Sequence, residues 1–457
     1  MNRRILGLAL PNIITNITVP LLGMVDTAIM GHLSEEGLGA IAIGASLFNL
    51  IYWNFGFLRM GTSGITAQAY GAKRWDEAVK TLVRACTIAL GIALALIVLQ
   101  WPIGLLVPVI FEGSDKVLAM ALTYFQVRIW AAPATLGLYA IKGWFIGMQD
   151  SKTPMWIAIA LNIVNIVFSL LFVLVFHWDI AGVALGTVVA QYSGLAMGIF
   201  FLRRKFRNEE LRMKHEASAD ATSRSSFLRG ALRWEEMRRF FKVNGDIFLR
   251  TVCLSAVFTF ITAAGSHISD EVLAVNNLLM QFFTLFSYIM DGFAYAGESL
   301  VGRYIGAREA KNLRSAVRLL IVWGLVLTVV FTGAYAVGGK WFLAIFTDQQ
   351  SVIDAAGDYL FWVLIVPVCG FAAFLFDGIF IGATASRSMR NAMFVATAAF
   401  FAVYYGLKAL NAPLDTLTWN NILWTAFIVF LTLRGLLQWM RLRKDVYGQV
   451  ETKTVAS

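Results

Sequence analysis

Polar and ionisable side chains inside long apolar stretches are the residues of this sequence that could do chemistry, because each is costly to place in an apolar environment. A first group consists of Asp26, Asn165, Ser169 and Thr187. At 1.5 Å per helical residue, Asp26 lies about 10 Å below one surface. Ser169 and Thr187 lie about 11 Å below it, with Asn165 one turn deeper. We expect one cluster, in which Asp26 is a candidate proton site and a counter-charge for a cation. In the alternative, Asp26 only accepts hydrogen bonds and the other three join neighbouring helices.

A second group consists of Asp246, Arg250, Glu298 and Asp377. Arg250 and Asp377 each lie about 12 Å from the opposite surface, and Glu298 lies somewhat closer to it. The opposite signs of these side chains predict a buried ion-pair network. Such a network is either static or exchanges partners when the halves of the protein move.

The elements that must position these residues are membrane-spanning helices. Hydrophobic residues make up 58% of the chain and charged residues 14%, and the mean hydropathy is +0.69. A soluble protein would not tolerate these values, so we predict an all-α polytopic membrane protein. We predict twelve transmembrane helices, at residues 5–32, 38–70, 79–111, 118–148, 154–176, 180–202, 239–265, 271–303, 314–346, 355–384, 389–409 and 418–440.

The Lys and Arg residues between these spans predict the orientation of the chain. The breaks on the side of the N-terminus hold 28 of them, and the opposite breaks hold Lys116, Lys340 and Lys408. Basic loops resist translocation, so we place both termini in the cytoplasm of a multi-pass protein of the cell (inner) membrane. The net charge of +10 is explained in this way without nucleic acid. The three cysteines lie inside spans and predict apolar packing, not a disulfide framework.

An internal repeat divides the spans into two halves. The run Gly-Trp-Phe-Ile-Gly from Gly143 returns 235 positions later as Gly-Ile-Phe-Ile-Gly from Gly378. Six spans per half predict two six-helix lobes related by a pseudo-two-fold axis along the membrane normal. Pro11 and Pro20 in the first span favour bends and are hinge candidates. The predicted parts are an N-terminal lobe at 1–202, a cytoplasmic basic linker at 203–238, a C-terminal lobe at 239–445 and a cytoplasmic tail at 446–457.

Catalytic motifs are missing from the sequence. It contains no Gly-x-x-x-x-Gly-Lys-Ser/Thr, no His-Glu-x-x-His and no Gly-x-Ser-x-Gly. An ATP-driven pump and an enzyme are therefore disfavoured. We expect no cofactor and no metal site beyond a coupling ion.

Three segments resemble the multidrug and toxic compound extrusion (MATE) family. The segment from Pro20 to Gly31 carries the family likeness, and those beginning at Asp246 and Asp377 resemble its DinF-type branch. The resemblance implies a V-shaped, two-lobe, twelve-helix antiporter that exports organic cations in exchange for protons or sodium ions. It also implies that Asp26, Asn165 and Thr187 serve ion coupling. The family commonly has an aspartate four residues after the asparagine of span five, where this chain has Ser169.

Proton coupling is the form of transport that the missing second carboxylate favours. A sodium ion prefers several anionic oxygens, whereas a proton needs one base. We therefore expect export of organic, cationic and hydrophobic compounds in exchange for protons by alternating access, with Asp26 as the carrier. The alternatives are sodium-coupled efflux and a lipid-linked oligosaccharide flippase, which would need a more cationic cleft. The expected partners are small organic substrates and membrane lipid, and we expect a monomer.

Overall fold

The computed structural model describes residues 1–216, 230–347, 349–411 and 415–451, and every regular element in these ranges is a helix. Twelve helical segments in the described ranges are long and apolar enough to cross a membrane. The predicted all-α membrane architecture with twelve spans is thereby confirmed. Of the predicted linker and tail, residues 217–229 and 452–457 lie outside the described residues.

The chain divides into two compact units. The N-unit comprises Ile14–Ala69 and Arg74–Lys242, and the C-unit comprises Met1–Ile13, Tyr70–Lys73 and Val243–Ser457. The first residues of the chain and the loop at Tyr70–Lys73 thus group with the C-terminal half.

Close packing accounts for the place of that loop in the C-unit. A Cβ atom added at Gly71 would lie 1.9 Å from the carbonyl oxygen of Arg303, so only glycine allows the two backbones to approach this closely. The Arg303 guanidinium also lies 5.8 Å from the centre of the Tyr70 ring.

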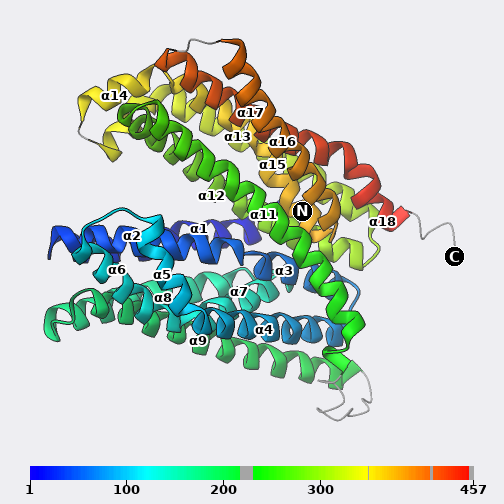
Figure 1. The fold of residues 1–457 in the computed structure, drawn as a ribbon. Coiled ribbons are helices and arrows are strands. Elements are labelled where there is room, and N and C mark those ends of the chain that lie inside the picture. The colour runs from blue at the N-terminus through cyan, green and yellow to red at the C-terminus, as the bar shows by residue number, and fades with distance from the viewer. Residues whose placement is uncertain (217–229, 348, 412–414, 452–457) are drawn as a thin grey trace. The chain divides into compact units, whose positions relative to one another are not determined.

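The N-unit is built from the helices α1 to α9, and α1 crosses the boundary between the two units. Helix α8 lies along α9, α6 contacts α2 and α9, and α4 contacts α7 (Figure 1). The predicted span at 79–111 is divided at Leu99, three residues before Pro102, whose ring crowds the carbonyl group of Val98 and disfavours a continuous helix at this point. The helices are α1 (Asn2–Gly31), α2 (Glu35–Asn54), α3 (Phe57–Gly71), α4 (Trp75–Val98), α5 (Gln100–Ile110), α6 (Asp115–Arg128), η1 (Ile129–Ala131), α7 (Ala132–Gly147), α8 (Lys152–Leu170), η2 (Leu171–Val175) and α9 (Asp179–Glu216).

The C-unit is organised around α15, which contacts α12, α13 and α17. It is also the most buried of the candidate spans, with 61% of its apolar window inside the protein. Helix α11 begins at Trp234 in the N-unit and continues into the C-unit from Val243. The helices are α11 (Trp234–Ile268), α12 (Asp270–Gly306), α13 (Ala310–Phe346), α14 (Gln350–Gly357), α15 (Leu360–Gly382), α16 (Ser386–Leu410), α17 (Thr416–Leu442), η3 (Arg443–Tyr447) and α18 (Gly448–Glu451).

The repeated glycines have the same packing role in both units. A Cβ atom at Gly143 would lie 2.3 Å from the carbonyl oxygen of Arg59, which brings α7 against α3. A Cβ atom at Gly378 would lie 2.2 Å from the carbonyl oxygen of Ala294, which brings α15 against α12. Small residues allow such approaches between membrane helices. The duplication has therefore preserved one helix-packing contact in each half.

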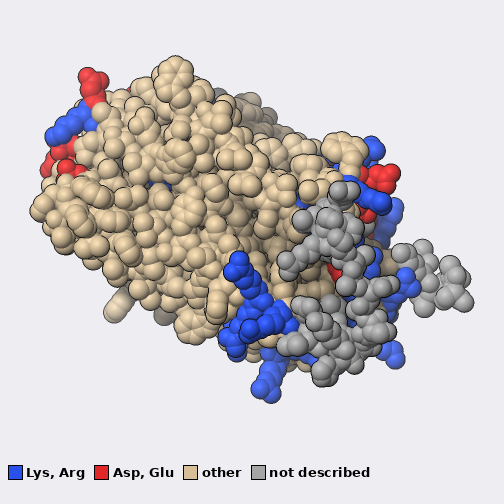
Figure 2. Space-filling view, turned by 90° about the horizontal axis from the view of Figure 1, so that it is seen from below, with Lys and Arg blue, Asp and Glu red and all other residues tan. Residues whose placement is uncertain are grey.

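Charged side chains are unevenly distributed on the surface. The face in Figure 2 is uncharged over most of its area, and more of its Lys and Arg side chains lie toward one end than toward the other. On α9, the apolar part of the helix is followed by the exposed side chains of Arg203, Arg204 and Arg207. The uncharged part of this face suits a protein that is surrounded by lipid.

Candidate functional site

A buried polar cluster in the N-unit contains all four residues of the first predicted group. Asp26 is 1% exposed, Thr187 is 1% exposed, and Asn165 and Ser169 are fully buried. The Thr187 hydroxyl donates a hydrogen bond of 3.1 Å to Oδ2 of Asp26 and accepts one of 3.1 Å from the Asn165 amide. The Asn165 amide lies 3.4 Å from the Ser169 hydroxyl. The structure thus joins α1, α8 and α9 through these side chains.

A change of helix geometry lies close to Ser169. The α-helix α8 changes to the π-helical turn η2 directly after Leu170, and such turns often occur at functional sites. On the facing helix α9, Gly186 precedes Thr187, and a Cβ atom at Gly186 would lie 2.3 Å from the Ser169 hydroxyl oxygen. The close approach of α8 and α9 therefore depends on this glycine.

Replacing Gly186 with alanine tests that dependence. The added methyl group would clash with Ser169, so the helices must separate and the hydrogen bonds around Asp26 lengthen. We expect Gly186→Ala to lower the free energy of unfolding by about 1–3 kcal/mol and to reduce transport. Thermal unfolding in detergent measures the first effect. Gly91→Ala on α4 is the matched control, because its Cβ atom would have no heavy atom within 4 Å.

Two residues of α6 complete the cluster and were not predicted. The Tyr124 hydroxyl donates a hydrogen bond of 3.1 Å to Oδ2 of Asp26 and accepts one from the guanidinium of Arg128. The guanidinium carbon lies 4.8 Å from the centre of the Phe48 ring and 5.3 Å from that of Tyr124. A basic residue within a span was the signal in the sequence, but nothing in the spacing connects Arg128 with Asp26.

A second buried cluster lies in the C-unit around Asp377. This carboxylate pairs with Arg250 of α11, as the predicted network requires, and with Arg434 of α17 at 2.8 Å. Its Oδ1 accepts a hydrogen bond of 2.7 Å from the amide of Gln438. Arg434 and Gln438 are each 2% exposed and were missed, although their spacing of four residues places them on one helix face.

The other two acids of the predicted network have different surroundings. Asp246 pairs with Arg390 at 2.6 Å and accepts a hydrogen bond of 2.9 Å from the Ser386 hydroxyl, both on α16. Glu298 is 1% exposed on α12. A Cβ atom at Gly382 of α15 would lie 2.6 Å from the Glu298 carbonyl oxygen. Asp246 and Asp377 therefore hold two separate sets of partners.

The hinge candidates Pro11 and Pro20 lie inside the continuous helix α1. The boundary between the two units falls between Ile13 and Ile14, thus between the two prolines. Within the described ranges, no group of three or more His, Cys, Asp or Glu side chains is arranged to hold a metal ion.

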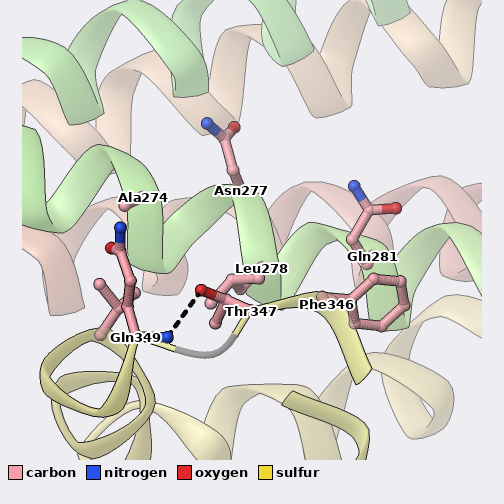
Figure 3. Close-up of a pocket in the computed structure, with 8 residues that line it drawn as sticks. Ala274, Asn277, Leu278, Gln281, Phe346, Thr347 and Gln349 are labelled. Carbon is pink, nitrogen blue, oxygen red and sulfur yellow. Dashed lines mark hydrogen bonds between the residues drawn. The ribbon is translucent and has the colours of Figure 1, made fainter. Parts of the chain in front are cut away.

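A surface cavity of about 320 Å³ lies in the C-unit, and none of its described lining residues belongs to the charged clusters. Figure 3 shows the amide side chains of Asn277, Gln281 and Gln349 around it. The Thr347 hydroxyl, which also lines the cavity, accepts a hydrogen bond of 3.2 Å from the backbone N–H of Gln349. The described lining carries no charged side chain.

Comparison with known proteins relates both halves of the chain to one family. The MatE family model matches residues 11–171 and 247–405. DNA damage-inducible protein F of Escherichia coli (strain K12) is 38% identical over 432 residues, covering 94% of this chain and 89% of that protein. The probable multidrug resistance protein NorM of Neisseria meningitidis serogroup B (strain ATCC BAA-335 / MC58) is 23% identical over 453 residues, covering 95% and 92% of the two chains.

Solved structures share the fold over the whole chain. A structure of MATE in the bent conformation gives a TM-score of 0.83 at 17% identity and covers 100% of this chain and 97% of that chain. The outward-facing conformation of a multidrug resistance MATE family transporter gives a TM-score of 0.81, also at 17% identity, and covers 98% and 96%. The family model, the relative with 38% identity and the fold agree. The chain is a multi-pass membrane protein that belongs to the MatE family, a family of transporters and not of enzymes.

Proposed function

We propose that the protein is a secondary active antiporter that exports organic compounds, cationic and hydrophobic in character, in exchange for protons. The observation that carries this proposal is the burial of Asp26, whose Oδ2 accepts hydrogen bonds from the Tyr124 and Thr187 hydroxyl groups. A carboxylate in an apolar span is costly, and such residues mark ion pathways and proton relays. The names of the relatives, which include multidrug resistance proteins, support the class of substrate.

The proposed cycle alternates the access of the cluster between the two sides of the membrane. Asp26 takes up a proton from the outer side, which neutralises the counter-charge and weakens the hold on a cationic substrate. The substrate leaves, and the protonated form returns to face the cytoplasm. One pH unit supplies about 1.36 kcal/mol, and a membrane potential of 100 mV adds about 2.3 kcal/mol per charge. This drive is sufficient to concentrate a substrate many-fold.

The orientation and partners belong to the same proposal. The basic residues at one side of the spans favour an inner-membrane protein with both termini in the cytoplasm. The chain would act as a monomer on small organic compounds, surrounded by lipid and without a resident cofactor.

The coupling ion is tested by adding the carboxylate that the family commonly has after Asn165. Ser169 is fully buried beside Asn165. A second anionic oxygen pair in the cluster favours a hard cation, so we expect Ser169→Asp to increase the sodium dependence of transport. Efflux from vesicles with and without a sodium gradient measures it. An unchanged response to sodium would contradict the role given to this serine.

Reconstituted vesicles separate the proposed function from its alternatives. We expect an imposed pH gradient to drive uptake of ethidium into inside-out vesicles, and ethidium addition to move protons, seen with a trapped pH dye. A sodium gradient alone should drive no uptake of ethidium. Sodium-driven uptake would favour the sodium-coupled alternative. Movement of a lipid-linked oligosaccharide without any gradient would favour the flippase.

A further inference from the structure

Two hydrogen-bond chains in the N-unit cluster run toward the same carboxylate oxygen. Arg128 donates to the Tyr124 hydroxyl, which donates to Oδ2 of Asp26 at 3.1 Å. Asn165 donates to the Thr187 hydroxyl at 3.1 Å, which donates to the same Oδ2 at 3.1 Å. The hydrogen of the Tyr124 hydroxyl therefore points at Asp26 and its oxygen lone pairs point away, whereas the Thr187 hydroxyl can also donate to the carbonyl oxygen of Val183, 3.3 Å away.

The direction of the first chain is imposed by Arg128. A guanidinium has donors and no acceptor, so the Tyr124 hydroxyl must accept from it and can only donate onward. Arg128 stays charged at any physiological pH. The Phe48 ring, 4.8 Å from the guanidinium carbon, helps to hold it in place.

From this geometry we propose that Arg128, acting through Tyr124, is the residue that makes the Asp26 site selective for a proton over a sodium ion. A sodium ion needs several oxygen lone pairs, but at Oδ2 of Asp26 it would meet the hydroxyl hydrogen of Tyr124 and, beyond it, the positive charge of Arg128. A proton needs only the carboxylate oxygen. Arg128 is thus a positioning and specificity-determining residue, and this inference rests on the proposed function of Asp26.

The charged and titratable groups around this pair come from several helices. Tyr124 and Arg128 lie on α6, and Arg128 also interacts electrostatically with Tyr52 of α2 and Tyr139 of α7. The groups from α8 and α9 are the neutral Asn165, Ser169 and Thr187. Within the described part of this cluster, Asp26 is therefore the carboxylate that interacts with the positive charge of Arg128.

The experiment compares ²²Na⁺ binding and the pH profile of ethidium efflux in purified, reconstituted variants of the full chain. The wild type should show no ²²Na⁺ binding that depends on Asp26. Arg128→Gln should bind ²²Na⁺ saturably and lose this binding when Asp26→Asn is added. Without the positive charge, Asp26 holds its proton more strongly, so the pH of half-maximal efflux should rise by roughly one to three units.

Conservative variants distinguish this role from a structural one. Arg128→Lys keeps a donor-only cation and should behave as the wild type. Tyr124→Phe removes the hydroxyl group that links Arg128 to Asp26 but keeps the charge of Arg128. This variant should also bind ²²Na⁺. Lys116→Gln, which removes an exposed cation paired with Glu36 at 2.9 Å, is the matched control and should change neither readout.

The outcomes separate this inference from the function on which it rests. The role of Arg128 would be overturned if Arg128→Gln and Tyr124→Phe both bound ²²Na⁺ as the wild type does and both kept the pH profile of the wild type. Binding of ²²Na⁺ at Asp26 in the wild type would overturn it as well. The proposed function fails by a different result, namely pH-driven efflux that persists in Asp26→Asn alone.

Discussion

Asp26→Asn is expected to reduce pH-driven efflux to the level of vesicles without protein, while the variant still inserts and folds. The asparagine side chain has nearly the same shape and keeps one carbonyl oxygen for the hydrogen bonds from Tyr124 and Thr187. It does not take up a proton in the working pH range, so the coupling step is lost. Ethidium efflux driven by an imposed pH gradient measures this, and size-exclusion chromatography checks the fold.

The matched control for this variant is Asp115→Asn, which neutralises an exposed acid in the first turn of α6. It should transport as the wild type does, because Asp115 lies outside the cluster. Wild-type efflux in Asp26→Asn would reject the proton role of Asp26. The carrier would then have to be sought among the acids of the C-unit.

Asp377→Asn is expected to be the most destabilising single change in the C-unit. Asp377 accepts from Arg250, Arg434 and Gln438, and all four side chains are buried. Removal of its charge leaves two buried guanidinium groups without their shared anion. Breaking a buried pair in this way costs about 3–5 kcal/mol. We expect a large fall in the thermal unfolding temperature and a low yield of folded protein.

A second substitution shows whether the uncompensated positive charge causes the loss of stability in Asp377→Asn. Adding Arg434→Gln to Asp377→Asn removes one of the uncompensated cations and should restore part of the lost stability. The control is Asp354→Asn on the exposed surface of α14, where the carboxylate only accepts a hydrogen bond from Gln350. An unchanged unfolding temperature in Asp377→Asn would show that the cluster contributes no net stability.

The depth of a residue along its span was predictable, whereas its direction around the helix axis was not. Counting residues placed Asp26, Ser169 and Thr187 at one level, and the structure brings them into one hydrogen-bonded cluster. The same counting could not connect Arg128 with Asp26, because their link runs through the ring of Tyr124. Height follows from a constant rise per residue, but contact also requires that two helices present the right faces to each other.

The ion pairs of the C-unit show the same division. The signs of Arg250 and Asp377 were enough to predict that they pair, and the structure joins them. The predicted network did not include Arg434, and it grouped Asp246 with Arg250, Glu298 and Asp377, whereas the structure pairs Asp246 with Arg390. Charge alone does not choose among several possible partners, because the choice depends on which helices lie side by side.

The sequence by itself determined that this protein has twelve membrane spans, that it is duplicated with a period of 235 residues and that it is a MATE-family transporter. These properties follow from the transfer of apolar residues out of water and from motifs local in the chain. Only the tertiary structure decided that Tyr124 and Arg128 complete the Asp26 cluster and that Tyr70–Lys73 joins the C-unit. Both depend on contacts between residues far apart in the chain, which arise from packing at positions such as Gly71 and Gly186.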